Sequence, residues 1–156
     1  DRIFTAFDQR TEAWGLEKIK TIGDAYMVAG GVPDDRPGHL EAIARLALAM
    51  REDIRAIGEK TGHTWLDLRV GIDTGPVVAG VTGRRKFIYD LWGDTVNTAS
   101  RLQTSGQPGQ IQVTARVQSA LAETFALRPR GTIELKGKGP TEVFLLDGVT
   151  PAAPGP

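Results

Sequence analysis

The spacing of hydrophobic residues between positions 40 and 57 constrains the fold of this chain more than any other feature. Apolar side chains recur there at intervals of three and four, with charged residues between them: Ile43, Ala47, Met50, Ile54 and Ile57. This period places them on one stripe of an α-helix. A helix with one apolar stripe must bury it against a second layer, which the rest of the chain has to supply.

The stretch WLDLRVGID, residues 65–73, changes to a period of two. Its apolar residues fall on one face and its charged residues on the other: Leu66, Leu68, Val70 and Ile72 against Asp67, Arg69 and Asp73. Strict alternation of this kind is typical of a half-buried β-strand. The segment therefore predicts a strand over 65–73 that can cover the helix before it.

Glycine turns divide the remaining chain into further helices and strands. We expect a helix over 1–13, a hairpin in LEKIKTIGDAYMVAGG, strands in PVVAGV, KFIYDL and QIQV, a helix after Trp92, a helix in ARVQSALAETF, and a terminal hairpin around KGKGPTE. Helices interspersed with hairpins favour an α+β fold, with helices packed on a mainly antiparallel sheet. We assign residues 1–149 to one domain and the Pro-rich residues 150–156 to a disordered tail.

Composition excludes several classes of function. Lys plus Arg and Asp plus Glu number 19 each, so the chain has no global basic field for nucleic acid. It has no cysteine, which excludes disulfides and a thiolate nucleophile. No apolar run approaches the roughly 20 residues that span a bilayer, so we expect no membrane contact by this segment. We expect a cytoplasmic location, either alone or as the cytosolic domain of a larger, membrane-anchored protein.

Four motifs in order carry a family resemblance: EKIKTIGDAYMVAGG, LRVGIDTGPVVAG, YDLWGDTVNTASRL and the KGKG turn. Together they resemble the catalytic domain of class III adenylate and guanylate cyclases over nearly the whole chain. The resemblance implies a ferredoxin-like (βαββαβ) core and a head-to-tail homodimer with active sites at the interface. It also implies conversion of a nucleoside triphosphate to a 3′,5′-cyclic monophosphate and pyrophosphate, with two Mg²⁺ or Mn²⁺ ions per site.

Asp24 is the candidate metal ligand. It follows Gly23 at the tip of the first predicted hairpin, and it matches the second metal-binding aspartate of the family. A hard carboxylate suits Mg²⁺ or Mn²⁺. Aspartate is also common in turns for conformational reasons alone, so a structural role is the alternative.

Lys20 and Asp90 match the pair of residues that selects the base. Adenine offers an acceptor at ring nitrogen 1 and donors on its amino group, which suit a lysine donor and a carboxylate acceptor. Guanine has the reverse pattern, and guanylate cyclases of the family carry Glu and Cys at these positions. The sequence therefore predicts ATP as the substrate.

Asn97 and Arg101 lie one turn apart on a predicted helix, where side chains at i and i+4 are neighbours. By resemblance, Asn97 orients the ribose and Arg101 contacts the α-phosphate during catalysis. Arg69 and Lys136 match family positions that hold the terminal phosphates. Each of these residues could otherwise be an ordinary solvated surface group.

One segment of the family pattern is missing. The first metal-binding aspartate of the family lies in a strand well upstream of the first hairpin, and no matching segment is present. We therefore expect the given residues to lack one metal ligand and a central strand. The Arg-rich stretch GVTGRRKF has no Walker pattern, which indicates a solvated turn, and the two isolated histidines are assigned no chemistry.

Two other functions compete with a homodimeric adenylate cyclase. A catalytically inactive, nucleotide-binding regulatory subunit would have the same motifs but lack turnover. An RNA-binding module can share the ferredoxin-like fold. The balanced charge and the absence of a Gly-aromatic pattern in KFIYDL disfavour RNA.

Overall fold

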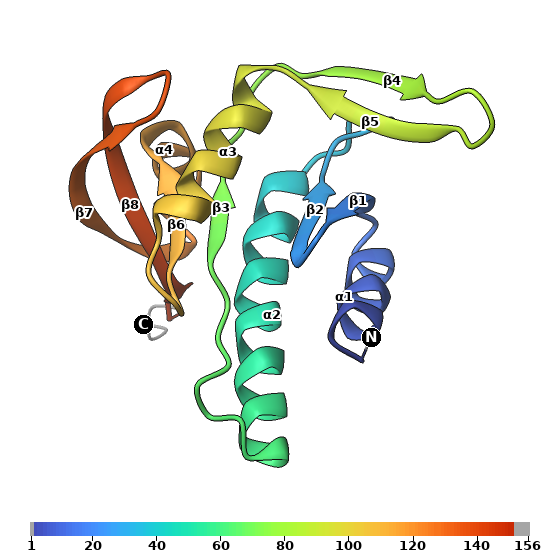
Figure 1. The fold of residues 1–156 in the computed structure, drawn as a ribbon. Coiled ribbons are helices and arrows are strands. Elements are labelled where there is room, and N and C mark those ends of the chain that lie inside the picture. Colours follow the sequence, from blue (N-terminus) through green and yellow to red (C-terminus); the bar gives the residue numbers. More distant parts are fainter. Residues whose placement is uncertain (1, 152–156) are drawn as a thin grey trace, which may run out of the picture.

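The computed structural model describes residues 2–151, and it contains helices and mainly antiparallel strands (Figure 1). The helices are α1 (Arg2–Ala13), α2 (His39–Thr61), α3 (Asp94–Ser105) and α4 (Ala115–Leu121). The strands are β1 (Glu17–Ile22), β2 (Ala25–Ala29), β3 (Val70–Ile72), β4 (Val78–Thr82), β5 (Ile88–Trp92), β6 (Ile111–Thr114), β7 (Phe125–Leu135) and β8 (Gly139–Val149).

The strands of residues 2–151 form three separate sheets. A four-stranded sheet has the order β3-β6-β8-β7, in which β3 and β6 are parallel and the other pairs antiparallel. The hairpins β1-β2 and β4-β5 are each a two-stranded antiparallel sheet. Figure 1 shows the β4-β5 hairpin as an arm that projects away from the four-stranded sheet.

Helix α2 joins the two halves of the core. Ala44 and Ala47 pack with β3, β6, β8 and α4, where Ile72, Val113 and Leu146 are buried. Another side of the same helix packs on α1 and the β1-β2 hairpin, in a cluster of Phe7, Leu16, Leu46, Met50 and Ile54. The predicted stripe over 40–57 therefore does lie in the core, and its helix extends to Thr61 before ending at Gly62.

The predicted strand over 65–73 is wrong in length, since β3 contains only Val70–Ile72. Leu66 and Leu68 do pack on the core as their period suggests. The neighbouring strand β6 begins at Ile111, however, so residues before Val70 lie beside a loop, whose Gly109 amide donates to the Leu68 carbonyl at 2.8 Å without starting a regular ladder. Alternation of burial therefore occurs here without regular pairing.

The helix predicted in ARVQSALAETF is also too long. It ends at Leu121, and Phe125 is the first residue of β7, with its side chain buried against the core. The loop between β4 and β5 is exposed, as predicted for GVTGRRKF. The predicted tail lies largely outside the described residues, so the boundary at 149 stays a prediction.

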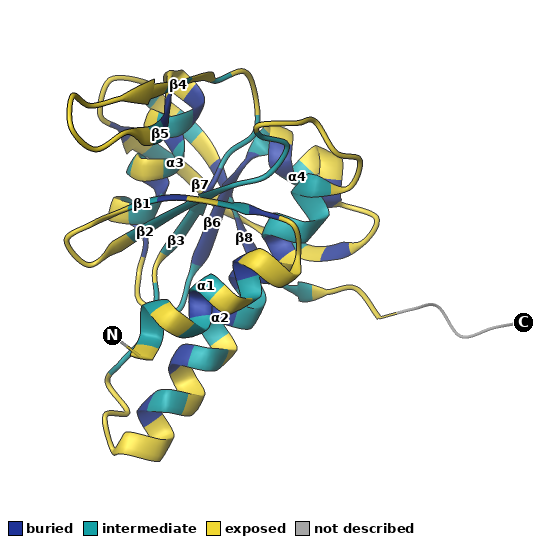
Figure 2. Ribbon diagram, turned by 90° about the vertical axis from the view of Figure 1, so that its right-hand side faces the viewer, coloured by how far each residue is buried: buried dark blue, intermediate teal, exposed yellow. Residues whose placement is uncertain are grey.

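Figure 2 shows that exposed residues dominate the β4-β5 hairpin, whereas β6, between β3 and β8 in the four-stranded sheet, is buried along its whole length. Large apolar side chains contribute to this exposure on the arm: Val78, Val81, Phe87, Ile88 and Trp92. No helix within residues 2–151 is both long enough and apolar enough to cross a membrane.

Candidate active site

The tip of the β1-β2 hairpin carries Asp24. Ile22 and Ala25 are the last paired residues, and Gly23 adopts a φ of 59°, which a residue without a side chain tolerates best. The turn leaves Asp24 exposed, and its carboxylate makes no hydrogen bond or ion pair within the described chain. The carboxylate is therefore available to a ligand, although it does not identify one.

Lys20 and Asp90 meet across two hairpins that lie far apart in the sequence. Lys20 Nζ donates to Asp90 Oδ2 at 2.8 Å, and the side chains are 33% and 12% exposed. The other carboxylate oxygen of Asp90 accepts from the Leu91 amide. The hydrogen bond from Lys20 is the main cause that lowers the pKa of Asp90. The pair thus presents a cationic donor beside an ionised acceptor.

Helix α3 carries Asn97 and Arg101 away from its packed side. Its buried residues are Thr95, Thr98 and Leu102, whereas Asn97 is exposed and Arg101 is half-buried. Neither the Asn97 amide nor the Arg101 guanidinium has a side-chain hydrogen bond or ion pair among residues 2–151. Both polar groups can therefore reach a ligand without breaking an internal contact.

The turn between β7 and β8 lies at the beginning of α3. Lys138 Nζ is 2.6 Å from the carboxylate of Asp94, the first residue of that helix. This ion pair brings the turn that carries Lys136 close to the candidate residues on α3. Lys136 itself is exposed and has no ion-pair partner within the described residues. Sequence reasoning missed the ion pair between Lys138 and Asp94, although the place of Lys138 in the KGKG turn could have indicated a role for it.

Arg69 lies toward the opposite end of α3. Its Nη1 is 3.4 Å from the backbone oxygen of Thr104, and the residue is exposed. Thr104 is seven residues after Asn97, which corresponds to about 10 Å along a helix. The structure therefore brings Lys20 together with Asp90, and Lys136 toward α3, but it does not bring Arg69 to the beginning of α3.

The described residues do not form a complete metal site. No group of three or more His, Asp or Glu side chains within residues 2–151 could hold a metal ion. Asp24 offers one oxygen donor of the kind that Mg²⁺ and Mn²⁺ prefer. One carboxylate does not fit a two-metal centre.

A buried ionic cluster near α3 was also missed by sequence reasoning. The Asp73 carboxylate is 1% exposed and accepts from Arg116 and from the Thr114 hydroxyl. The sequence placed Asp73 on the polar face of a strand, which predicts solvent exposure. The sequence did contain a signal for this cluster: Thr114 and Arg116 stand where the predicted strand QIQV passes into the predicted helix ARVQSALAETF.

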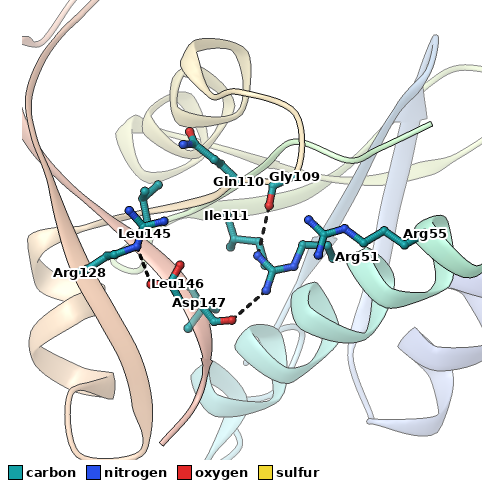
Figure 3. A pocket seen from close by; sticks show the side chains of 9 residues that line it. All are labelled: Arg51, Arg55, Gly109, Gln110, Ile111, Arg128, Leu145, Leu146 and Asp147. Atoms are coloured by element: carbon teal, nitrogen blue, oxygen red, sulfur yellow. Dashed lines mark hydrogen bonds and ion pairs between the residues drawn. The ribbon is translucent and has the colours of Figure 1, made fainter. Parts of the chain in front are cut away.

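A polar cavity lies away from all of these residues. It has a volume of ≈ 230 Å³ and is lined by Arg51, Arg55, Gly109, Gln110, Ile111, Arg128, Leu145, Leu146 and Asp147 (Figure 3). Its guanidinium groups already have partners in the chain: carbonyl oxygens of Gly109 and Asp147 for Arg51, and carboxylates for the other two. We therefore assign this cavity a structural role.

Comparison with known proteins identifies the family. Residues 1–148 match the adenylate and guanylate cyclase catalytic domain, and the chain belongs to this family. An adenylate cyclase of Mycobacterium tuberculosis is 49% identical over 153 residues, which cover 98% of this chain and 34% of the relative. A membrane guanylyl cyclase of Dictyostelium discoideum is 38% identical, covering 94% of this chain and 9% of the relative.

A solved structure agrees with this assignment. The guanylate cyclase domain of RhGC from Catenaria anguillulae, crystallised in complex with GTP, has a TM-score of 0.89 and 32% identity, covering 96% of this chain and 81% of that one. The predicted α+β cyclase fold is thereby confirmed. Because the chain spans about a third or less of these curated relatives, the activity of the whole protein is a matter for proposal.

Proposed function

We propose that this domain is the catalytic domain of an adenylate cyclase, which converts ATP to 3′,5′-cyclic AMP and pyrophosphate. The observation that carries this proposal is the contact between Lys20 and Asp90. A lysine donor 2.8 Å from a carboxylate acceptor can serve the adjacent acceptor and donor on the edge of adenine. Guanine would present a carbonyl to the carboxylate and an N–H to the ammonium, leaving both pairs mismatched.

The other candidate residues have roles that follow from family resemblance and from their available side chains. Asn97 orients the ribose, and Arg101 stabilises the charge that develops at the α-phosphate when the 3′-hydroxyl attacks it. Arg69 and Lys136 bind the terminal phosphates. Asp24 offers a carboxylate oxygen to a divalent cation, Mg²⁺ or Mn²⁺.

The direct test uses the protein that carries this domain, purified and incubated with ATP or GTP in Mg²⁺ or Mn²⁺ buffer. We expect cyclic AMP from ATP and little cyclic GMP from GTP. A preference for GTP would contradict the role of Lys20 and Asp90. Nucleotide binding without either product would favour the second candidate, an inactive nucleotide-binding regulatory subunit, which is supported by the single candidate metal ligand among residues 2–151.

We also propose that the active sites are composite and form in a head-to-tail homodimer in the cytoplasm. The exposed apolar side chains of the β4-β5 arm support association, because apolar groups of this size gain from burial. In this arrangement, Asp24 and Arg69 serve a site from one subunit, and the remaining candidates serve it from the other. Arg69 lying apart from the beginning of α3 agrees with such a division.

Subunit mixing tests the composite site. Asp24→Ala and Arg101→Ala proteins should each be inactive, whereas a mixed dimer has both lesions in one site and neither in the other. Activity should return to at most about a quarter of wild type, because half of the dimers are mixed and half of their sites intact. If labelled subunits exchange but activity does not return, the residues act within one chain.

A further inference from the structure

The carboxylate of Asp73 is buried at the point where β3 ends. Its oxygens accept from the Thr74 amide at 2.8 Å and from the Thr114 hydroxyl at 2.7 Å. Arg116 adds a two-pronged contact, with Nε at 2.9 Å and Nη2 at 2.7 Å. A buried carboxylate is costly unless it is paired in this way. Asp73 therefore fixes Arg116 at the shared end of β3 and β6.

Arg116 extends the cluster from the sheet to the first turn of α3. Its Nη2 lies 3.5 Å from the Thr95 hydroxyl, and that hydroxyl donates to the Pro76 carbonyl at 2.9 Å. Gly75 leaves room for the guanidinium, since a Cβ there would be 2.8 Å from Arg116 Nη1. The loop after β3 and the beginning of α3 are thus packed around one side chain.

The rest of α3 is held to the sheet by different contacts. Its middle lies directly on β3 at Gly71, where a Cβ would clash with the Ala99 carbonyl. At its end, the Gln112 amide donates to the Leu102 carbonyl at 2.6 Å, and Arg130 donates to the Ser105 carbonyl at 3.1 Å. The Arg116 contact completes this series at the first turn, next to Asn97.

We propose that Asp73 and Arg116 are positioning residues, whose ion pair holds the first turn of α3 so that Asn97 and Arg101 meet the nucleotide in a fixed geometry. The catalytic consequence rests on the proposed cyclase function. The structural consequence, a rigid first turn of α3, does not depend on it. Neither residue needs to touch the substrate.

Loss of this contact should reduce turnover more than substrate affinity. A shift of about 1 Å in a positioned group can lower a rate by roughly 10²-fold, whereas ground-state contacts with the base and phosphates change less. We expect Arg116→Gln to lower kcat at least tenfold, with the KM for ATP within about threefold of wild type. Arg116→Lys keeps the charge but loses the two-pronged geometry, so it should recover part of the loss.

A matched control is available on the other side of the sheet. Arg128 and Asp147 form an ion pair with the same 2.7 Å separation, on β7 and β8, with side chains 61% and 41% exposed. Asp147→Asn should leave kcat within about twofold, because exposed pairs contribute little. Asp73→Asn combined with Arg116→Gln should have a kcat no lower than the worse single variant if the two residues act as one unit.

Hydrogen exchange provides a readout that does not require cyclase activity. In Arg116→Gln, amides in residues 94–98 should exchange faster than in wild type, while the Asp147→Asn protein should match wild type there. Arg116→Gln leaves the buried Asp73 carboxylate without its cation, whereas the double variant leaves no charge unpaired, so the double variant should fold even if Arg116→Gln does not. If the wild-type protein forms no cyclic nucleotide, the proposed function fails and the exchange data alone decide the positioning role.

Two results would overturn the inference. One is unchanged exchange in residues 94–98 of a folded Arg116→Gln protein. The other is a loss of kcat in Arg116→Gln together with faster exchange throughout the domain, when Asp147→Asn shows the same loss and the same exchange. That result would indicate general destabilisation of the domain rather than local positioning of α3.

Discussion

The four-stranded sheet and the two hairpins differ in how their charged and apolar side chains are satisfied. Around the sheet, Asp73, Gln112 and Thr98 are buried, and the first two have several polar partners. On the hairpins, Asp24 has no ion-pair partner within the described chain, and large apolar side chains such as Phe87 and Val81 are exposed. Asp73 and Gln112 are therefore satisfied within the chain, although the buried Thr98 hydroxyl has no hydrogen-bond partner within residues 2–151, whereas the hairpins expose groups that another molecule can satisfy.

This contrast indicates where binding energy can come from. A side chain that already has partners must give them up to bind a ligand, which offsets most of the gain. Arg101 and Lys136 make no side-chain hydrogen bond or ion pair within residues 2–151, yet they lie on or beside α3, which the sheet holds firmly. Groups that are unpaired but carried by a rigid element are suited to act in a transition state.

The largest expected effect tests this combination at Arg101. Arg101→Ala should lower kcat by about 10²-fold or more, because it removes a positioned donor from the developing charge. The KM for ATP should stay within a few-fold, since the interaction is made mainly in the transition state. Steady-state kinetics measure both values. A large rise in KM with kcat preserved would make Arg101 a ground-state anchor instead.

A smaller effect is expected from the pair that joins the two hairpins. Lys20→Glu combined with Asp90→Cys replaces the donor and acceptor that we assign to adenine. The ratio of kcat/KM for ATP to that for GTP should fall by roughly tenfold or more, because mismatched hydrogen-bonding groups in a pocket are left unpaired. Competition assays with both nucleotides measure this ratio. An unchanged ratio would remove the pair from base selection.

Exposed ion pairs offer a control for that experiment. Lys18 is on the same strand as Lys20 and pairs with Asp8, with side chains 39% and 46% exposed. Lys18→Glu makes the same chemical change two residues away, across a register shift in the β1-β2 pairing, on a side chain that contacts Asp8 of α1 rather than Asp90. It should leave the ratio of ATP to GTP within about twofold.

Sequence patterns predicted the sheet region and the hairpins with different success. The helix stripe that includes Met50 and Ile54 was correct because burial on one side leaves a clear period. The strand beginning at residue 65 was too long, since its alternation reflects packing of Leu66 and Leu68 but not ladder pairing. Pairing depends on where β6 begins, which no local pattern records.

The candidate site shows the same division. Lys20 and Asp90 were named from motifs 70 residues apart, and the structure places them in contact. The alternation over 65–73 placed Asp73 on the charged face of its predicted strand, a face that usually contacts solvent. Its burial depends on Arg116, 43 residues later, and on the parallel pairing of β3 with β6. Long-range pairing of this kind is invisible to a reading of local spacing.

The smallest expected effect concerns Tyr26, which ties the β1-β2 hairpin to α1. Its hydroxyl donates to Asp8 at 2.7 Å and lies 3.3 Å from the Thr11 hydroxyl. Burial is the main cause that raises the pKa of Tyr26 to about 12. The unfolded chain would lose this proton near pH 10, while the native protein keeps it, so the native state binds more protons between pH 10 and about 12.

Stability should therefore fall with rising pH across that window, and Tyr26 should account for part of the fall. We expect at most about 1 kcal/mol from this group after allowing for solvent screening. Urea unfolding of wild type and Tyr26→Phe at pH 8 and pH 11 measures the effect. The stability advantage of wild type over Tyr26→Phe should shrink at pH 11. A constant difference in stability between wild type and Tyr26→Phe would show that the Tyr26 hydroxyl does not couple hairpin packing to proton binding. The hairpin would then be held to α1 by apolar contacts, such as those of Phe4 and Phe7 with the Tyr26 ring.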